Sequence, residues 1–282
     1  MIKYQITSQY IFWRIKKIIG NFLPCKSWRK KWQHSLPRKW DVISFSEKSM
    51  NEYSKLLKKY VDVLSPEDSL DLALEKKSFC RIGDGEFNII IGHRNSFNDP
   101  DNKLAKRLIE ICETGSTDNI LVCQNNYKLS KEHPTYTWFV HHGTRYMQDV
   151  LNNVTFPKQK FADAYFLVRN QDNEGMNKIF SLWNGKKVLF VCNKKSPIIE
   201  DKLGFFKDVI QKEFLFVPNK NAIASYDEVL ANIKKFDKSW KIYLEAGATA
   251  SVLAWDLAKE GYNAYDMGDF YKRTEVRISE AN

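Results

Sequence analysis

Short apolar runs alternate with amphipathic segments along most of the chain. The apolar runs predict seven strands, at residues 78–82, 119–123, 164–169, 186–192, 213–218, 240–246 and 262–267. Apolar positions at helical spacing predict helices at residues 101–114, 135–150, 201–212, 225–236 and 248–261. Because apolar strands that alternate with helices are typical of parallel sheets, we expect an α/β fold, with a mostly parallel sheet and helices on both faces. Such sheets bind ligands at the carboxyl ends of their strands.

Two further helices are expected ahead of the first strand. Residues 46–64 have helical periodicity, and a second helix is expected at residues 65–77. Ser65 is a typical N-cap residue, Pro66 suits the first helical position, and acidic side chains follow in the first turn. This second helix should lead the chain directly into the strand at residues 78–82.

The N-terminal segment is expected to form an amphipathic helix with a basic face. Its apolar positions recur at helical spacing, at Ile11, Ile15, Ile18 and Phe22. Residues 1–40 hold ten Lys/Arg and no Asp/Glu, so they carry the whole formal net charge of +10 and the remaining chain is neutral. Four of the eight tryptophans lie in the same segment.

Three interpretations fit this basic segment. Lysine and arginine are attracted to anionic lipid headgroups and tryptophan prefers the headgroup level, so residues 1–40 are expected to contact a membrane surface. The alternatives are a helix packed on the protein's own body and an arm that binds nucleic acid. Basic residues interrupt the apolar run well short of the ~20 residues of a spanning helix, and no secretory cleavage site follows. We expect a cytoplasmic protein, peripheral at the inner face of the membrane, without a nucleic-acid partner.

The overall composition indicates a folded protein from a reducing compartment. The chain has 282 residues and 43 % hydrophobic content, enough for a substantial core. Its five cysteines are odd in number and without a C-x-x-C pair, which argues against a disulfide framework or a structural zinc site. No repeat or linker follows residue 45, so the simplest division is an N-terminal segment at residues 1–44 and one domain at residues 45–282.

The stretch RIGDGEF, residues 81–87, places an arginine and two carboxylates around two glycines. In an extended segment Asp84 and Glu86 would project to the same side and share one Mg²⁺ or Mn²⁺. Arg81 adds a positive fork for a phosphate, and Gly83 lets the backbone approach a ligand. The alternative is a plain hairpin turn, because Asp-Gly between apolar residues is a common turn signal.

A second motif, GATAS at residues 247–251, follows the strand expected at residues 240–246. Gly247 lies at the turn into a helix, and the small residues after it would leave the helix N-terminus uncovered. Its free N–H groups and the Thr249 hydroxyl would then form an anion site. The alternative is an ordinary turn capped by the threonine. Asp266 and Asp269 follow the last expected strand and fall on the same edge of the sheet.

In order and spacing, these motifs resemble the bacterial glycosyltransferases of the GT-D fold, first known as a domain of unknown function. RIGDGEF is followed by WNGKKVLFV, VPNKNA and GATASVLAWDLAKEGYNAYDMGD. The resemblance implies a Rossmann-like domain that transfers a sugar from a nucleotide-sugar donor, expected to be UDP-linked, to a glycan or lipid-linked acceptor. It implies a divalent metal, Mn²⁺ or Mg²⁺, at Asp84 and Glu86. It also implies donor contacts at Arg81, Gly83, Asp84, Glu86, Asn221, Gly247 and Thr249.

The chain departs from the family pattern at two places. Gly268-Asp269 replaces a Gly-His pair, and KKSPIIEDKLGFF replaces an Arg/Gly/Asn-Asp-Leu stretch, so the sugar and the catalytic base do not carry over. Asp269 and Asp266 are the expected bases of an inverting enzyme, and Arg169 the expected contact for a phosphate or an acceptor.

These expectations combine into a metal-dependent glycosyltransferase of the hexosyltransferase class, acting in cell-surface polysaccharide or glycoprotein synthesis. One alternative is a metal-dependent phosphohydrolase, because carboxylates on Mg²⁺ serve hydrolysis equally well. The other is a non-catalytic protein that binds a membrane or a nucleic acid.

Overall fold

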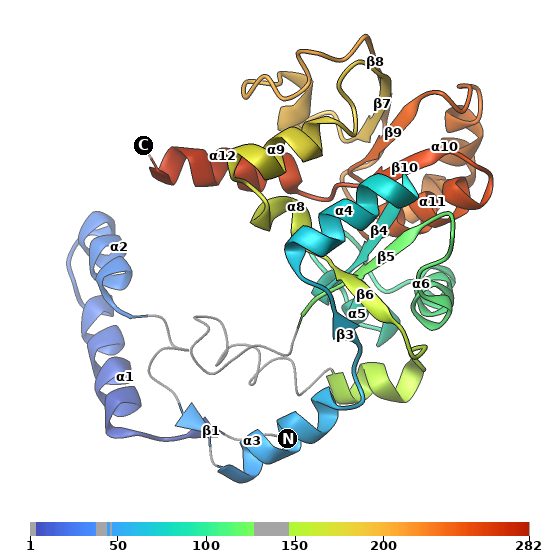
Figure 1. Cartoon of the computed structure of the whole chain (residues 1–282). Coiled ribbons are helices and arrows are strands. Elements are labelled where there is room, and N and C mark those ends of the chain that lie inside the picture. Colours follow the sequence, from blue (N-terminus) through green and yellow to red (C-terminus); the bar gives the residue numbers. More distant parts are fainter. Residues whose placement is uncertain (1–3, 38–43, 46, 127–146, 282) are drawn as a thin grey trace. The chain divides into compact units, whose positions relative to one another are not determined.

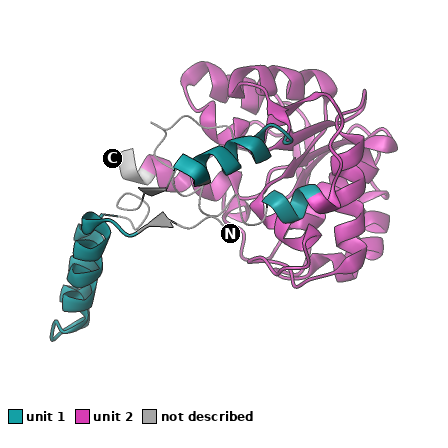
Figure 2. Cartoon of the chain, turned by 90° about the horizontal axis from the view of Figure 1, so that it is seen from below, with its two compact units in different colours: residues 1–60, 127–151 teal, residues 61–126, 152–282 magenta. Residues whose placement is uncertain are grey.

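The computed structural model describes residues 4–37, 44–45, 47–126 and 147–281 (Figure 1). The chain divides into two compact units (Figure 2). The first comprises residues 1–60 and 127–151, and the second comprises residues 61–126 and 152–282. The predicted division into residues 1–44 and 45–282 stays a prediction.

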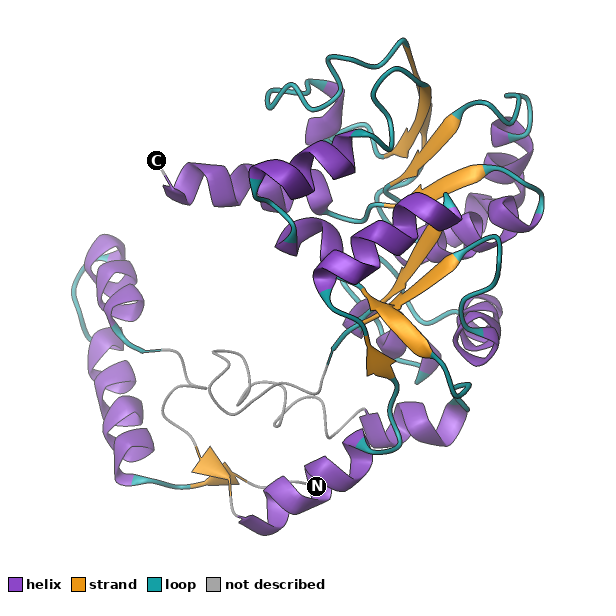
Figure 3. Ribbon diagram, in the orientation of Figure 1, coloured by secondary structure: helices purple, strands orange, loops and turns teal. Residues whose placement is uncertain are grey.

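The second unit is built on an eight-stranded sheet in which every neighbouring pair of strands is parallel (Figure 3). In spatial order the strands are β3 (Asp62–Val63), β6 (Lys160–Asp163), β5 (Leu121–Gln124), β4 (Phe79–Ile82), β10 (Asn263–Asp266), β9 (Lys241–Leu244), β7 (Lys187–Cys192) and β8 (Gln211–Phe216). From β4 the chain proceeds to β5 and β6 on one side, whereas β7 to β10 all lie on the other side. The strand order therefore reverses between β4 and β10, and open α/β sheets bind ligands at such a point.

Helices cover both faces of this sheet. One group comprises α4 (Pro66–Lys76), α8 (Phe166–Arg169), α9 (Asn173–Phe180) and α12 (Phe270–Ala281), and α4 packs on β5 and β6. The other group comprises α5 (Asp84–Ile90), α6 (Asn102–Thr114), α10 (Tyr226–Ile233) and α11 (Ala248–Lys259), and α11 packs on β4, β9 and β10. The predicted α/β fold with a parallel sheet is confirmed (Figure 1).

The start of α4 follows the predicted capping pattern. The Ser65 hydroxyl accepts the Asp68 N–H at 3.1 Å, and Pro66 is the first helical residue. The helix predicted at residues 46–64 is shorter in the structure, since α3 ends at Leu57 and residues 62–63 form β3. Of the helix predicted at residues 135–150, residues 135–146 lie outside the described part of the chain, and residues 147–153 are helical.

Six of the seven predicted strands are present, and the strand predicted at residues 164–169 is wrong. The strand lies earlier, as β6, and Phe166–Arg169 form the short helix α8. Asp163 ends the strand because its Oδ1 accepts the Tyr165 N–H at 2.8 Å, a side-chain to backbone bond that favours a turn. The apolar run is therefore divided between a strand and a helix.

The helix predicted at residues 201–212 is also wrong. Asp201 has φ 43°, and its carboxylate oxygens accept the N–H groups of Phe205 and Phe206, each at 3.0 Å. These bonds fold the segment into turns that deliver both phenylalanines into the core, and β8 begins at Gln211. The short 3₁₀ helix η2 (Pro197–Ile199) precedes them, and a second, η3 (Ala222–Ser225), precedes α10.

An aromatic core supports the half of the sheet that contains β7 and β9. Trp183 is buried, donates its Nε1–H to Phe205 O at 2.9 Å and lies with its ring centre 5.0 Å from that of Phe206. Phe206 in turn packs edge-on against Tyr243 of β9, with ring centres 5.5 Å apart. Each buried ring removes a large apolar area from water, which holds β7, β9 and the start of α12 in fixed positions.

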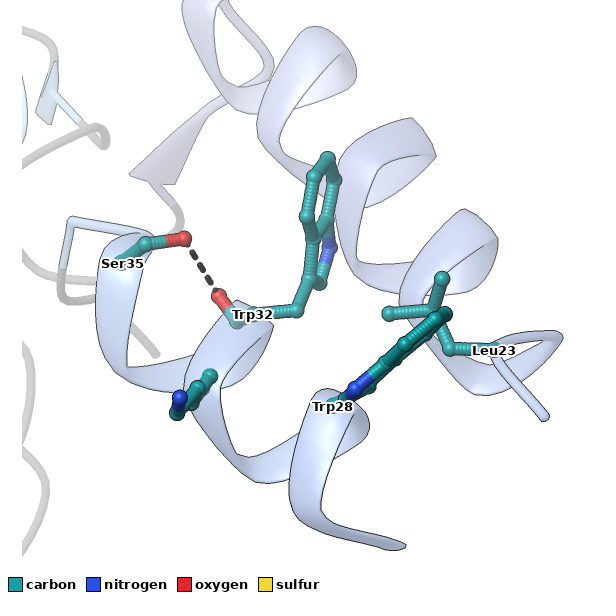
Figure 4. Close-up of a pocket in the computed structure, with 5 residues that line it drawn as sticks. Leu23, Trp28, Trp32 and Ser35 are labelled. Carbon is teal, nitrogen blue, oxygen red and sulfur yellow. Dashed lines mark hydrogen bonds between the residues drawn. The ribbon is translucent and has the colours of Figure 1, made fainter. Parts of the chain in front are cut away.

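The first unit contains a helical hairpin of α1 (Ser8–Asn21) and α2 (Lys26–Ser35), with β1 (Tyr4–Gln5) paired antiparallel to β2 (Ser44–Phe45), and α3 (Glu47–Leu57). Trp32 of α2 donates its Nε1–H to Lys16 O at 2.8 Å. A Cβ atom on Gly20 would lie 2.2 Å from the Trp32 ring, so only glycine allows this close packing. A cavity of about 340 Å³ in the hairpin is lined by Leu23, Trp28, Lys31, Trp32 and Ser35 (Figure 4).

The predicted helix in the N-terminal segment is confirmed, and its apolar row lies on the surface. Tyr10, Trp13 and Gly20 are the buried residues of α1. The predicted apolar positions are 48–83 % exposed, at Ile11, Ile15, Ile18 and Phe22. Among the described residues, no helix is long and apolar enough to cross a membrane.

Candidate active site

The first motif forms the start of a helix. β4 ends at Ile82, Gly83 is the N-cap, and α5 begins at Asp84. Asp84 and Glu86 therefore occupy the first and third helical positions, where side chains two residues apart do not face each other. The predicted extended segment is wrong because the Glu86 carboxylate accepts the Gly83 N–H at 2.8 Å and caps the helix.

Asp84 and Glu86 consequently have different neighbours. Asp84 Oδ1 accepts a hydrogen bond from Asn125 Nδ2, just after β5, at 2.8 Å. Burial raises the pKa of Tyr165, and the charge of Asp84 adds to that shift, so Asp84 acts on the side of the site that Tyr165 occupies. Glu86 interacts instead with Arg81 and with the N-terminus of its own helix.

Arg81 connects three elements at this edge. Its backbone N–H donates to Asp266 Oδ2 at 3.1 Å, and its Nε lies 3.8 Å from Asp266 Oδ1. Its Nη1 donates to Ala164 O at 3.2 Å. The guanidinium also lies against Gly268, which has φ 51° and where a Cβ atom would be 1.6 Å from Nη2. Gly268 is therefore needed both for its left-handed backbone and for the space that Arg81 fills.

Acidic groups outnumber basic groups around Arg81. Burial raises the pKa of Glu86 to about 7, and Asp266 adds to the shift, whereas Arg81 opposes it. Burial also raises the pKa of Asp266 against the effect of Arg81. For Arg81 itself, burial lowers the pKa, but the charges of Asp266, Asp269 and Glu86 outweigh this effect and raise it. Arg81, together with Arg273 at Asp269, thus faces three carboxyl groups, a balance that favours an additional cation.

The two aspartates predicted as bases lie at the expected edge, in different environments. Asp266 is buried at the end of β10, and its Oδ2 accepts the Ser251 hydroxyl at 2.8 Å as well as the Arg81 N–H. It fixes Arg81 and α11 relative to the sheet. Asp269 is half exposed just before α12 and accepts the Nε–H of Arg273 at 2.7 Å.

Arg169 lies at the end of α8 rather than at the end of a strand. It forms a hydrogen-bonded ion pair with the buried Asp163, whose pKa is raised by burial and lowered in turn by Arg169. Its guanidinium is 5.6 Å from the ring centre of Tyr165, and that of Arg273 is 5.4 Å from the same ring. Both guanidinium groups are thus within cation–π distance of Tyr165, whereas the carboxyl groups that act on Arg81 are Asp266, Asp269 and Glu86.

The turn at Gly247 forms as predicted, but a loop covers it. Gly247 has φ 57° and precedes α11. A Cβ atom on Gly247 would lie 3.1 Å from Phe97 Cβ and from Asn98 Oδ1. Thr249 is 1 % exposed, and its Oγ1 has no hydrogen-bond partner among the described residues, nor have the side-chain polar atoms of Asn98. The small residues of this motif therefore make room for a covering loop, and the expected uncovered helix end is wrong.

Asn221, predicted as a donor contact, holds this covering loop, residues 95–99. Its Oδ1 accepts the Asp99 N–H and its Nδ2 donates to Asp99 Oδ2, both at 2.8 Å. At the other end of the loop, Asn95 Nδ2 donates to Gly85 O in α5 at 3.0 Å. The loop therefore links the two sequence motifs, which the structure brings to one edge of the sheet.

Two residues at this edge were missed by the sequence analysis. Tyr165 lies inside the wrongly predicted strand at residues 164–169, just before α8 in the structure, and carries no motif that would single it out. Glu245 lies in the strand expected at residues 240–246, two residues before GATAS. It directly follows β9, and its Oε2 accepts a hydrogen bond from the hydroxyl of Ser196. The signal for Glu245 was available, because an acid at the carboxyl end of a central parallel strand faces the ligand edge.

The described residues include no group of three or more His, Cys, Asp or Glu side chains that is placed to hold a metal ion. Asp84 and Glu86 nevertheless offer oxygen ligands of the kind that Mg²⁺ and Mn²⁺ prefer, at an edge with excess acidic charge. Magnesium bound with a phosphorylated substrate usually takes one or two protein carboxylates and completes its ligands with phosphate and water. The residues present therefore fit a cation that arrives with a phosphorylated ligand better than a resident structural ion.

Fold and edge together define an open parallel α/β sheet protein with a ligand edge where the strand order reverses. Residues 79–277 match the family described as Glycosyltransferase GT-D fold. That range spans both motifs and the whole sheet beyond β3, and the chain belongs to this family.

Similar proteins carry the same description. The chain is 27 % identical over 222 residues to the probable glycosyl transferase Gly of Streptococcus gordonii. This match covers 74 % of this chain and 32 % of that protein. It is 25 % identical over 230 residues to the glycosyltransferase GlyD of Streptococcus pneumoniae serotype 4, covering 76 % of this chain and 28 % of that protein. The chain thus spans about a third of the length of the curated relatives that it matches.

Solved structures agree in fold. One, described as the domain of unknown function 1792 with a distinct glycosyltransferase fold, superposes with a TM-score of 0.71 at 27 % identity, over 82 % of this chain and 86 % of that one. Another, described as a new glycosyltransferase of the same domain type from Streptococcus sanguinis, superposes with a TM-score of 0.70 at 24 % identity, over 78 % of this chain and 86 % of that one. The family match and the solved structures therefore agree that residues 79–277 have the GT-D fold.

Proposed function

We propose that the protein transfers a hexose from a nucleoside-diphosphate sugar, UDP-linked, and that the diphosphate binds between β4 and β10. The observation that carries the proposal is the buried guanidinium of Arg81 among Glu86, Asp266 and Asp269, at the point where the strand order reverses. A fixed guanidinium suits a phosphate oxygen.

A divalent cation, Mn²⁺ or Mg²⁺, is part of this proposal. Asp84 and Glu86 would hold it, and when bound it would neutralise charge on the departing diphosphate. Support comes from the charge balance, because three carboxyl groups act on Arg81, and burial together with the charge of Asp266 raises the pKa of Glu86 to about 7. Arg81 orients the diphosphate, and Asp266 keeps Arg81 in position through its ion pair at 3.8 Å.

We further propose that the acceptor is a glycan or a lipid-linked sugar of surface polysaccharide or glycoprotein synthesis, and that the first unit binds the inner face of the membrane. The hairpin of α1 and α2 has an exposed apolar row, and residues 1–40 contain only basic charged residues. Apolar side chains insert at the acyl boundary and Lys/Arg bind anionic headgroups, each contributing roughly 1 kcal/mol. This arrangement would hold the enzyme where a lipid-linked acceptor lies.

The donor proposal is tested by thermal shift with a panel of nucleotide-sugars, with and without Mn²⁺. We expect one donor to raise the melting temperature only when Mn²⁺ is present, because ligands that bind only the folded state stabilise it. The variant Asp84→Asn should lose most of this rise, and Asp118→Asn, at an exposed site in the same unit, should retain it. If no nucleotide-sugar stabilises the wild type with Mn²⁺, the proposal is wrong. Donor cleavage that does not respond to any acceptor would favour the phosphohydrolase.

A further inference from the structure

Glu245 is fixed at the carboxyl edge of the sheet, two residues before Gly247. It follows β9, and its backbone N–H donates to Val191 O of β7 at 2.8 Å. The neighbouring strand β10 ends in register with β9, since Asp266 pairs with Leu244. Glu245 therefore lies next to the strand that carries Asp266, the carboxylate partner of Arg81, within the same compact unit.

One carboxylate oxygen of Glu245 is occupied and the other is available. Oε2 accepts the hydroxyl hydrogen of Ser196, and that hydroxyl in turn accepts the Ile198 N–H of η2 at 3.4 Å. Since Ser196 is buried and its oxygen accepts from the backbone, its proton is directed at Glu245. No described residue forms a hydrogen bond to Oε1 of Glu245. This geometry orients the carboxylate and leaves one basic oxygen for a ligand.

Titratable groups around Glu245 come from three parts of the chain. Asp269 and Lys272 face it from the start of α12, Tyr243 precedes it on β9, and Cys192 ends β7. Burial raises the pKa of Glu245 to about 7, Asp269 adds to the shift, and Ser196 and Lys272 oppose it. A carboxyl group with a pKa near the working pH accepts a proton readily and releases it again.

The two aspartates at the same edge are less suited to accept a proton. Asp266 is buried, and its oxygens serve Arg81 and Ser251. Asp269 is held by Arg273 through a hydrogen bond of 2.7 Å. Both carboxylates therefore have oxygens that are already occupied by an arginine. Glu245 has a serine as its hydrogen-bond partner instead.

We propose that Glu245 is the general base that deprotonates the acceptor hydroxyl, which rests on the donor site proposed above. The acceptor oxygen forms a bond to the anomeric carbon while the bond from that carbon to the diphosphate oxygen breaks. The electron pair of the broken bond leaves with the nucleoside diphosphate, toward Arg81. The hydroxyl proton passes to Oε1 of Glu245 and then to solvent. A single displacement of this kind inverts the anomeric centre, and Ser196 is a positioning residue for the base.

The test measures UDP release with the UDP-sugar that stabilises the wild type, Mn²⁺, and a panel of p-nitrophenyl glycosides as acceptors. Glu245→Gln should lower kcat by about 10²- to 10⁴-fold, the usual contribution of a general base, and should keep the thermal shift given by the donor. Formate should partly restore the activity of Glu245→Ala. Glu228→Gln, at an exposed glutamate of α10, should keep full activity.

The pH profile separates a base from a merely structural glutamate. The wild type should lose activity below about pH 7, since protonated Glu245 cannot accept a proton. Ser196→Ala removes a hydrogen bond that lowers the pKa of Glu245, so this limb should move to higher pH. Asp269→Asn removes a charge that raises that pKa, so the limb should move to lower pH.

Two results would overturn the assignment while the donor site stands: unchanged kcat in Glu245→Gln, or a retained anomeric configuration in the product. If wild type transfers to no glycoside of the panel, the same variants are compared on hydrolysis of the donor, where water is the nucleophile and needs the same base. If no UDP-sugar binds the wild type with Mn²⁺, the proposed function fails first and Glu245 has no such role.

Discussion

The two compact units use charge in opposite ways. The sheet unit is close to neutral and concentrates its functional charge at one buried edge, where Arg81 is surrounded by carboxyl groups. The helical hairpin of the first unit has basic charge without any acid, beside exposed isoleucines. A buried charge needs a fixed partner, whereas exposed charges are screened and act together through their summed charge. Single substitutions should therefore have large effects at the sheet edge and graded effects on the hairpin.

The largest effect is expected from Gly268→Ala. The new methyl group would lie where the Arg81 guanidinium is, and alanine would also have to adopt a positive φ. We expect kcat/KM for sugar transfer to fall at least about 100-fold, because displacement of a catalytic group by about 1 Å costs that much. The steady-state rate with donor and Mn²⁺ is the measurement.

The matched control for this variant is Gly185→Ala. Gly185 has φ 66°, but no atom lies within 4 Å of the position that a Cβ atom would take there, so this change imposes the backbone cost without a collision. It should lower stability by roughly 1 kcal/mol and leave activity unchanged. Equal activity losses in the two variants would show that the backbone, and not the Arg81 contact, is responsible.

The next largest effect concerns the hairpin. The double variant Ile15→Asp/Ile18→Asp places two charges in the exposed apolar row. We expect at least a tenfold loss of binding to vesicles that contain anionic lipid, since inserted isoleucines contribute about 1–3 kcal/mol each. Co-sedimentation with vesicles checks this, and kcat with a soluble acceptor should not change.

Gln9→Asp is the control, because it adds an exposed charge to α1 two positions before Ile11, on another side of the helix from that row. Binding that is equally weak in both variants would indicate simple charge repulsion rather than insertion. Unchanged binding in the double variant would rule out the apolar row as the contact with the membrane.

A smaller effect is expected on the stability of Glu245→Gln. This variant should lose activity but gain stability at high pH. The pKa of Glu245 is about 7 in the folded chain and about 4.3 in an unfolded one, so ionisation opposes folding increasingly from about pH 4.5 to pH 7. Glutamine removes this penalty. The variant should match the wild type at pH 4.5 and be more stable at pH 8, by about 1–3 kcal/mol.

Urea unfolding at the two pH values measures the difference. The control is Glu228→Gln, on the exposed side of α10. It keeps Glu245, so its free energy of unfolding should follow that of the wild type at both pH values. A stability difference that is the same at both pH values would contradict the raised pKa of Glu245.

Most of the fold could be predicted because its signals are local. The Ser65 cap, the apolar strands and the helix at residues 248–259 each follow from neighbouring residues. The errors came from side chains that bond to the backbone across a few residues. Asp163 ended a strand early, Asp201 replaced a helix by turns, and Glu86 turned an extended segment into a helix start.

The site was predicted in part for the same reason. Arg81 and the acids near it lie in short motifs, and the structure brings both motifs to one edge. Asn221 was expected to contact the donor, but its side chain pairs with Asp99, 122 residues away, which no local pattern reveals. The environment of Glu245 likewise depends on Ser196 and Lys272, whose proximity exists only in the folded sheet.

The smallest effect is expected from Ser65→Ala in the sheet unit. Loss of the hydroxyl that accepts the Asp68 N–H should lower the free energy of unfolding by about 1 kcal/mol. Ser65→Asp retains an acceptor and should restore it. Vesicle binding through the hairpin should be identical in all three proteins, and a change there would show that the two units are coupled.

The position of β10 sets the order in which the protein is assembled. This strand lies between β4 and β9, yet it is the last of the eight strands of the sheet to be synthesised. Until it emerges from the ribosome, the nascent chain has two half-sheets with open edges, and Arg81 lacks its carboxylate partner 185 residues further along. A prematurely terminated chain that ends before β10 therefore cannot connect the two halves of the sheet. It leaves β4 and β9 as unpaired edge strands that are prone to aggregation.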